Sequence, residues 1–200
     1  MTLTEMINNG SNAAEIGSHL DALNGDERWR EVSVLGRKLQ RSLFQTVAHT
    51  DPLDIDFFVP SEVEPLVPIR HRGRNTLPVP IDKVRFFAKV FCRPEDKSSR
   101  LFGYNDAPTG ALIGPGYFVA IKAQTSWQER GSVVVDYWQT PEGPVADGWP
   151  KVVPNSKGLQ RLVYFHTRDF MRRVSQHVSI GAAYKNNTPL DHYFVLCRQD

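Results

Sequence analysis

A two-residue alternation that begins at residue 83 constrains the fold of this chain more than any other feature. In the run KVRFFAKVFCRP, small and apolar side chains alternate with a mixed set. One face carries Val84, Phe86, Ala88, Val90 and Cys92, and the other carries Arg85, Phe87, Lys89, Phe91 and Arg93. Successive side chains of a β-strand point to opposite faces, so this run predicts a strand with one dry face and one mixed face.

Five further runs have the composition of strands, and most of their connections are short. They cover residues 100–104, 116–124, 132–140, 177–185 and 192–199. Glycine, proline and asparagine mark the connections NDAPTGALIGPG, SWQERG and KNNTPLD. Connections of this kind suit antiparallel neighbours, whereas a parallel pair needs a long crossover. The sequence therefore predicts a mainly antiparallel sheet of five or six strands.

Two capping-box patterns mark helix starts near the N-terminus. Asn12 is followed three positions later by Glu15, and Asn24 is followed by Glu27. In each pair the asparagine side chain can accept from an amide of the first turn while the glutamate reaches back to the cap. Apolar residues then recur at helical spacing, which predicts one helix after Asn12 and a longer amphipathic helix over residues 26–48.

Prolines interrupt these patterns in the segment 51–82. They are Pro52, Pro60, Pro65, Pro68, Pro78 and Pro80. Proline fixes φ and lacks an amide donor, so a segment with this many prolines is expected to be irregular. The large apolar residues of its DIDFFVP run indicate that the segment is pinned onto the core.

The run GLQRLVYFHTRDFMRRVSQ, which begins at residue 158, has features of both a helix and a strand. As a helix over residues 158–177 it aligns apolar side chains on one stripe with His166 among them. Its start, LQRLVYF, is typical of a strand, so the alternative is a strand up to Phe165 and a shorter helix after Asp169. We expect the helix over 158–177.

Together these patterns predict an α+β fold in a single domain over residues 1–200. Residues 1–50 would form a helical hairpin after a loose start at 1–10, and residues 51–82 a proline-rich loop. Residues 83–200 would form the antiparallel sheet, with a C-terminal helix inserted before the last two strands and covering the sheet. The sheet could also curl into a partial barrel.

His166, Asp169 and Arg173 would lie close together on the expected C-terminal helix. Asp169 and Arg173 are four residues apart and could pair on its surface. An imidazole that faces the sheet beside a carboxylate can act in acid–base chemistry, and the arginine could hold an anionic substrate. The alternative interpretation is a half-buried core histidine beside a surface ion pair.

Asp136 is a third catalytic candidate, because the run VVVDYWQT places it between Val134 and Trp138 on one strand face. Apolar surroundings disfavour an ionised carboxylate unless a cation pairs with it. Such a carboxylate can serve as a general acid or base. It can equally belong to a structural ion pair, for which Arg85 and Lys89 are available partners.

The run IRHRGRNT, residues 69–76, places Arg70, Arg72 and Arg74 around His71. Three guanidinium groups in a loop flanked by prolines can bind a carboxylate or phosphate through paired hydrogen bonds. We rank this run as the best polar site candidate. Its alternative interpretation is an exposed loop tip.

Small side chains line one face of the run 177–185, where Ser179, Gly181 and Ala183 alternate with larger residues. Protein interiors are close-packed, so something must fill the space above this lane. Either a helix lies close to it or it borders a cavity. In the second case His177 would lie at the rim and could contact a ligand.

Charge and motifs exclude several classes of function. The chain has 24 basic and 22 acidic residues, which is too balanced for a dedicated nucleic-acid binder. No run approaches the roughly 18–20 apolar residues of a membrane span, and the N-terminus lacks the pattern of a secretion signal. Cys92 and Cys197 form no metal-binding motif, so neither a metal nor a cofactor is indicated. We expect a cytoplasmic protein with two reduced thiols.

Three functional hypotheses follow from these features. The first is a binding module whose sheet and C-terminal helix enclose a pocket for a small anionic or polar ligand. The second is an enzyme that uses a His/Asp acid–base pair on such a ligand. The third is a protein-interaction or homodimerising module that uses the apolar stripe of the helical hairpin.

Overall fold

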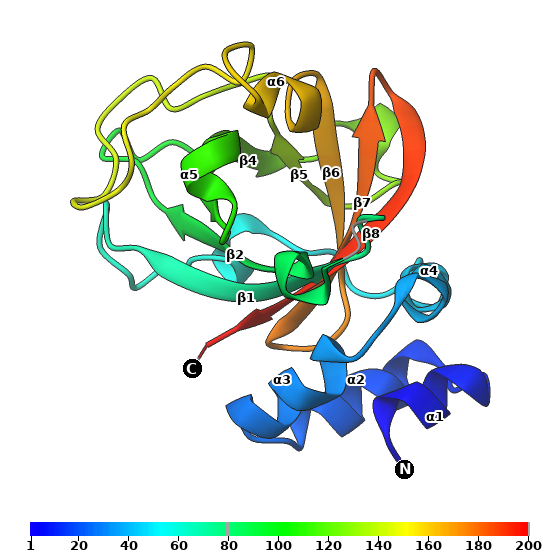
Figure 1. Cartoon of the computed structure of the whole chain (residues 1–200). Coiled ribbons are helices and arrows are strands. Elements are labelled where there is room, and N and C mark those ends of the chain that lie inside the picture. The colour runs from blue at the N-terminus through cyan, green and yellow to red at the C-terminus, as the bar shows by residue number, and fades with distance from the viewer. Residues whose placement is uncertain (79–80, 200) are drawn as a thin grey trace.

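A closed antiparallel β-barrel forms the centre of the computed structural model, which describes residues 1–78 and 81–199. Its eight strands follow one another round the barrel in sequence order, and β8 pairs with β1 to close it (Figure 1). They are β1 Ile69–Asn75, β2 Phe86–Cys92, β3 Arg100–Asp106, β4 Phe118–Lys122, β5 Val133–Asp136, β6 Thr167–Arg173, β7 Val178–Lys185 and β8 Thr188–Arg198. Full closure pairs every strand on both sides and removes the sheet edges.

The antiparallel arrangement is confirmed, but the prediction of five or six strands is wrong. The sequence patterns did not predict two of the strands, β1 and β6. β1 lies inside the segment 51–82 that we expected to be irregular, since the prolines of that segment fall outside its seven residues. Its backbone can therefore bond to β2 on one side and β8 on the other. Pro80 lies outside the described residues.

The segment 158–177 is a short helix followed by a strand, so the predicted long helix is wrong. Helix α6 covers only Gln160–Val163, and β6 then pairs with β5 and with β7. His166 lies at the turn between them with a φ of 61°. The run satisfies both a helical and an alternating pattern, and pairing with two neighbouring strands decides for the strand.

Helices form most of the N-terminal region and a few short connections. The α-helices are α1 Leu3–Asn8, α2 Ala13–Asp21, α3 Gly25–Ser33, α4 Arg37–Thr46, α5 Gly110–Ile113 and α6 Gln160–Val163. The 3-10 helices are η1 Ile55–Phe57, η2 Asp82–Arg85 and η3 Thr125–Trp127. Both predicted capping boxes are present at the starts of α2 and α3.

Two details of the N-terminal region differ from expectation. The expected loose start is helix α1, which begins with a third capping box between Thr2 and Glu5. The expected helix over 26–48 is divided into α3 and α4, because the chain leaves the helical path at Gly36, whose φ is −80° and ψ 177°. This division lets both helices place their apolar faces on the curved barrel wall.

The N-terminal helices cover the outer face of β7 and β8 on one side of the barrel (Figure 1). The buried side chains of this layer include Ile16, Leu20, Val32, Leu35 and Leu43 from the helices and Val178, Ile180 and Val195 from the strands. The apolar stripe of the helices is therefore covered by the protein's own sheet.

Three inward-facing glycines make room for three phenylalanine rings inside the barrel. The pairs are Gly73 with Phe87, Gly103 with Phe118 and Gly181 with Phe194. A Cβ atom on these glycines would lie 2.7, 2.4 and 2.3 Å, respectively, from an atom of the paired ring. The small-residue lane of β7 thus faces the barrel interior, where the ring of Phe194 and the sulfur of Met171 fill the space beside Gly181.

Candidate functional site

The run with Arg70, His71, Arg72 and Arg74 is strand β1 rather than a loop, and its alternation separates the side chains. His71 is fully buried in the barrel, and its Nε2 lies 2.9 Å from the carbonyl oxygen of Phe58. Burial lowers the pKa of His71 to about 4, so the ring is neutral at pH 7. The three arginines alternate with it, so His71 and the arginines form no common site.

The arginines of β1 also diverge from one another, because each meets a different carboxylate. The nitrogen–oxygen distances are 2.5 Å for Arg70 with Asp106, 3.6 Å for Arg72 with Asp26 and 3.0 Å for Arg74 with Asp82. They therefore cannot clamp one anion together, as a loop could have allowed. Arg74 nevertheless lines the recess that we consider the best binding site.

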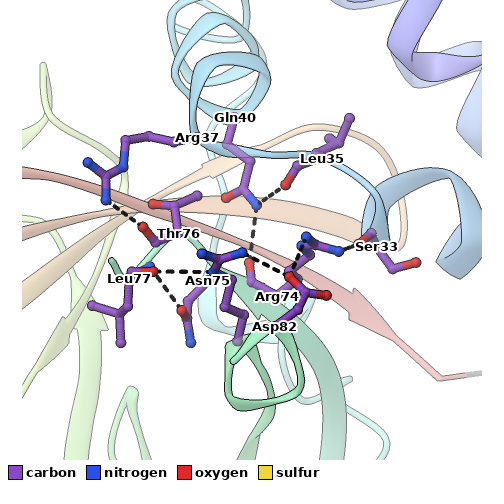
Figure 2. Close-up of polar contacts among 10 residues, drawn as sticks. Ser33, Leu35, Arg37, Gln40, Arg74, Asn75, Thr76, Leu77 and Asp82 are labelled. Carbon is purple, nitrogen blue, oxygen red and sulfur yellow. Dashed lines mark hydrogen bonds and ion pairs between the residues drawn. The ribbon is translucent and has the colours of Figure 1, made fainter. Parts of the chain in front are cut away.

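This recess lies between the start of α4 and the end of β1 (Figure 2). Its volume is about 240 Å³. It is lined by Gly36, Arg37, Arg74, Asn75, Thr76, Leu77, Pro78 and Arg85. Three of these side chains are arginines that come from a helix, a strand and the end of η2. We call it the arginine recess.

One carboxylate serves two of the three guanidinium groups in the arginine recess. Arg74 Nη2 and Arg85 Nη1 lie 3.0 and 2.9 Å from the same oxygen, Asp82 Oδ1. Arg37 donates to the carbonyl oxygen of Thr76 at 2.8 Å. Figure 2 shows Arg37 and Arg74 approaching from different elements. Among the residues that the structure describes, the charged side chains that line or bridge the recess are therefore three arginines and one aspartate.

Buried hydrogen bonds hold the arginine recess in shape. Gln40 of α4 is fully buried, and its Nε2 donates to the carbonyl oxygens of Leu35 at 2.9 Å and Arg74 at 3.3 Å. Arg74 Nη1 in turn donates to the carbonyl oxygen of Ser33 (Figure 2). These bonds tie the turn between α3 and α4 to strand β1.

The N-terminus of α4 differs from those of the three preceding helices. Helices α1, α2 and α3 each begin with a side-chain cap and have an acidic residue in the first turn. Helix α4 has Gly36 at its cap, Arg37 at its first position and no acidic residue in its first turn. A helix N-terminus carries partial positive charge, which favours an anion there. The start of α4 thus adds to the positive field of the recess.

A second polar group lies at the centre of the barrel. Lys89 of β2 is 2 % exposed, and its Nζ lies 3.1 Å from Asp169 Oδ2 and 2.9 Å from Asn105 Oδ1. It also bonds to the hydroxyl of Tyr137. Burial lowers the pKa of Lys89 and raises that of Asp169. Burial thus opposes the charged form of each group, while the charge of the partner and the hydrogen bond between them favour it.

Aromatic rings surround the Lys89 ammonium group. The ring centres of Phe87, Phe118, Tyr137 and Phe194 lie 5.8, 5.0, 5.0 and 4.8 Å from Nζ, respectively. Such distances allow attraction between a cation and the faces of the rings. The alternation of residues 83–93 placed Lys89 on the mixed face with Phe87 and Phe91, and this mixed face is the one that points into the barrel.

The three catalytic candidates do not form one group. His166 stacks on the rings of Trp138 and Phe165, with centres 4.0 and 3.8 Å apart. Asp169 points into the barrel to Lys89, and the helical pairing with Arg173 is wrong because the two residues lie on a strand. Their proposed cooperation depended on the helix over 158–177.

Asp136 is buried at the end of β5, where its Oδ2 lies 3.2 Å from Arg168 Nε. Its Oδ1 accepts from the backbone N–H of Trp138 at 2.9 Å. The expected partners Arg85 and Lys89 instead contact Asp82 and Asp169.

Arg173 and His177 lie apart from the arginine recess. Arg173 donates to the carbonyl oxygen of Pro52 at 3.4 Å, and its guanidinium lies 5.3 Å from the ring centre of Phe57. His177 Nδ1 lies 3.4 Å from Arg198 Nη2. The arrangement thus brings Arg74, among the proposed ligand-binding residues, to the arginine recess with Arg37 and Arg85. No local pattern singled out the latter two.

Comparison of the chain with protein-family models, with curated proteins and with solved structures finds no match. Within residues 1–78 and 81–199, no helix is both long and apolar enough to span a membrane. The same part of the chain has no cluster of three or more His, Cys, Asp or Glu side chains that could hold a metal ion. Cys92 and Cys197 are both buried. A function must therefore be argued from the geometry.

Proposed function

We propose that the protein is a binding module for a small anionic ligand, a carboxylate or a phosphate, held in the arginine recess. The observation that supports it is the set of three guanidinium groups and one bridging carboxylate around a space of about 240 Å³. Guanidinium groups present paired donors that match the oxygens of such anions. The volume suits a ligand smaller than most drug-like molecules.

Partial burial strengthens this proposal. The Arg74 side chain is 15 % exposed, and its Asp82 partner is more exposed at 55 %. Charges near a protein surface but partly withdrawn from water interact more strongly than fully solvated ones. An incoming anion can therefore replace Asp82 as the partner of Arg74 and Arg85.

The alternative hypotheses receive less support. An enzyme with a His/Asp pair needs an imidazole and a carboxylate in one concavity, whereas His166 stacks on Trp138 and Asp169 pairs with Lys89. An interaction module built on the helical hairpin needs an uncovered apolar stripe, whereas these helices pack on β7 and β8. The anion-binding proposal needs neither feature.

Isothermal titration with inorganic phosphate and with succinate at low ionic strength tests the proposal. We expect saturable binding of at least one anion at one site, weakened by added salt. The variant Arg37→Gln should lower its affinity by about tenfold or more, since a charged hydrogen bond contributes about 1.5–3 kcal/mol. The control is Arg100→Gln, at the start of β3. It removes an arginine that is also paired with an aspartate, Asp96, and should leave anion binding unchanged.

A second variant separates loss of binding from loss of folding. The cap position Gly36 has open space where a side chain would begin, and an extended backbone that other residues adopt. Gly36→Asp should therefore stabilise α4 through a side-chain cap while its carboxylate competes with the ligand. Absence of binding by the unmodified protein, or equal loss in Arg37→Gln and Arg100→Gln, would contradict the proposal.

A further inference from the structure

A second recess lies where the loop between α4 and η1 meets the end of β4, the start of β5 and the end of β6. Its volume is about 410 Å³, within the range of roughly 300–1,000 Å³ that is usual for small-molecule sites. Its lining includes Asp51, Asp54, Lys122, Ser132, Arg172 and Arg173, and it shares no residue with the arginine recess. We call it the β6 recess.

Hydrogen bonds fix the loop against the barrel and so define the β6 recess. Thr50 Oγ1 donates to the carbonyl oxygen of Arg173 at 3.0 Å, and the backbone N–H of Leu53 donates to Ser132 Oγ at 2.7 Å. Arg173 Nη2 donates in turn to the carbonyl oxygen of Pro52 at 3.4 Å. The groups around the recess are therefore held in place, which reduces the entropy that is lost when a ligand binds.

The two arginines at the end of β6, Arg172 and Arg173, lack a carboxylate partner among the residues that the structure describes, whereas the three arginines of β1 each have one. Arg172 donates to the backbone carbonyl oxygens of Phe44 at 2.6 Å and Glu129 at 2.7 Å. Arg173 donates to that of Pro52, and its Nε is buried without a hydrogen-bond partner in the described part of the chain. Burial lowers the pKa of Arg172, as expected for a cation withdrawn from water. Both guanidinium groups therefore favour an anionic group in the recess.

Charges of both signs line the β6 recess without pairing with one another. Asp51, Asp54 and Lys122 are exposed at its rim, and within residues 1–78 and 81–199 none of the three forms an ion pair. Asp54 Oδ1 instead accepts from the backbone N–H of Phe57 at 3.1 Å. The two carboxylates disfavour a second anionic group on a ligand and favour a positively charged one. The recess thus fits a molecule that carries one charge of each sign.

We propose that the β6 recess binds a small zwitterion of the amino-acid type. Arg172 and Arg173 would hold its carboxylate, because guanidinium groups present paired donors to carboxylate oxygens. Asp51 and Asp54 would attract its ammonium group. The hydroxyl of Ser132 accepts from a backbone N–H, and no described residue accepts its hydrogen, which is left to donate to the ligand. This site is separate from the arginine recess, so either proposal can fail without the other.

A titration followed by backbone amide chemical shifts tests the proposal on the full chain. Isotope-labelled protein is titrated at pH 7 with β-alanine, γ-aminobutyrate and ε-aminocaproate, which separate their two charges by increasing lengths. We expect at least one of them to shift the amide signals of Leu53 and Ser132 in a saturable way. No saturable shift with any of the three, or shifts confined to Leu77 of the arginine recess, would overturn the proposal.

Matched ligands test the zwitterionic class. The fatty acid of the same length lacks the ammonium group, and the dicarboxylate of the same length replaces it with a second anion. Both should bind the β6 recess more weakly than the zwitterion, since neither can be attracted by Asp51 and Asp54. Equal affinity of the fatty acid and the zwitterion would show that the ammonium group is not recognised.

Variants identify the residues that bind. Arg173→Gln should lower the affinity about tenfold or more, with circular dichroism to check the fold. Asp51→Asn changes an exposed side chain and should lower the affinity about two- to fivefold. Its control is Asp147→Asn, at an exposed aspartate outside both recesses, which should leave binding unchanged. Unchanged affinity in Arg173→Gln, or equal affinities of the two aspartate variants, would contradict the assigned contacts.

Discussion

Two buried titratable residues on neighbouring strands of the barrel differ in their hydrogen-bond partners. His71 of β1 and Lys89 of β2 are register partners. His71 bonds to a backbone carbonyl and is a neutral core residue, whereas Lys89 has a carboxylate, an amide and a phenol as partners. Burial disfavours the charged form of both, so the partners decide which charge the barrel tolerates.

His71 should make the protein sensitive to acid. Its pKa is about 4 in the folded state, against an ordinary value of 6.5, so the unfolded chain binds the proton more readily. The free energy of unfolding therefore falls as the pH drops below 6.5 towards 4, and His71 should account for a loss of about 2 kcal/mol between pH 7 and pH 5. Urea unfolding at the two pH values measures this.

The variant His71→Gln provides the comparison, because its amide can still donate to the carbonyl oxygen of Phe58 and does not titrate. Between pH 7 and pH 5, the free energy of unfolding of this variant should fall by about 2 kcal/mol less than that of the unmodified protein. If both proteins lose the same stability between pH 7 and pH 5, His71 is not the acid-sensitive group.

At the scale of elements, local capping chemistry identifies helices better than apolar spacing does. Asparagine caps mark the starts of α2 and α3, while apolar spacing alone joined α3 to α4 and predicted a helix over 158–177. A cap depends on residues three positions apart, so it acts within one turn. Apolar spacing can fit either a helix or a strand, and the neighbouring elements decide which one forms. For β6, pairing with β5 and β7 decides for the strand.

The cap of α3 should contribute measurably to stability. Asn24 Oδ1 accepts from the backbone N–H of Glu27 at 3.0 Å. Asn24→Ala should lower the free energy of unfolding by about 1 kcal/mol, whereas Asn24→Ser, which keeps a capping oxygen, should lose only a small part of it. Urea denaturation of the two variants measures the difference. Equal stabilities would show that the cap is not maintained in solution.

At the scale of the whole molecule, the helices and the barrel share one hydrophobic layer. Leu20 of α2 is fully buried in the cluster that contains Val178 and Val195 of the barrel. A cluster divided between two parts of a chain couples their unfolding, because neither part can bury its apolar surface alone. We therefore expect the helices and the barrel to unfold together.

The variant Leu20→Ala tests this coupling. It should lower the free energy of unfolding by about 2–5 kcal/mol through the cavity it leaves. In a Trp29→Phe background, which removes the tryptophan of α3, helix loss followed by circular dichroism and barrel loss followed by tryptophan fluorescence should shift to the same lower denaturant concentration. Two separate transitions, with only the helical one shifted, would show that the helices are an independent unit.

The sequence predicts only part of the candidate site. Arg74 belongs to a run whose arginine content was evident, but Arg37 and Arg85 come from separate elements and meet it only because α4 and η2 converge on the end of β1. The alternation of the sequence indicated that Lys89 lies on the same strand face as Phe87 and Phe91. That this face is the inside of a barrel depends on closure.

The sequence by itself determined six of the eight strands, most of their short connections and the caps of α2 and α3, because each of these depends on residues within a few positions of one another. The tertiary structure decided that β8 meets β1, that β1 and β6 are strands, and which side of each strand faces inward. The physical reason is that backbone bonds to distant neighbours and close packing of rings against Gly73, Gly103 and Gly181 select one arrangement among several locally acceptable patterns.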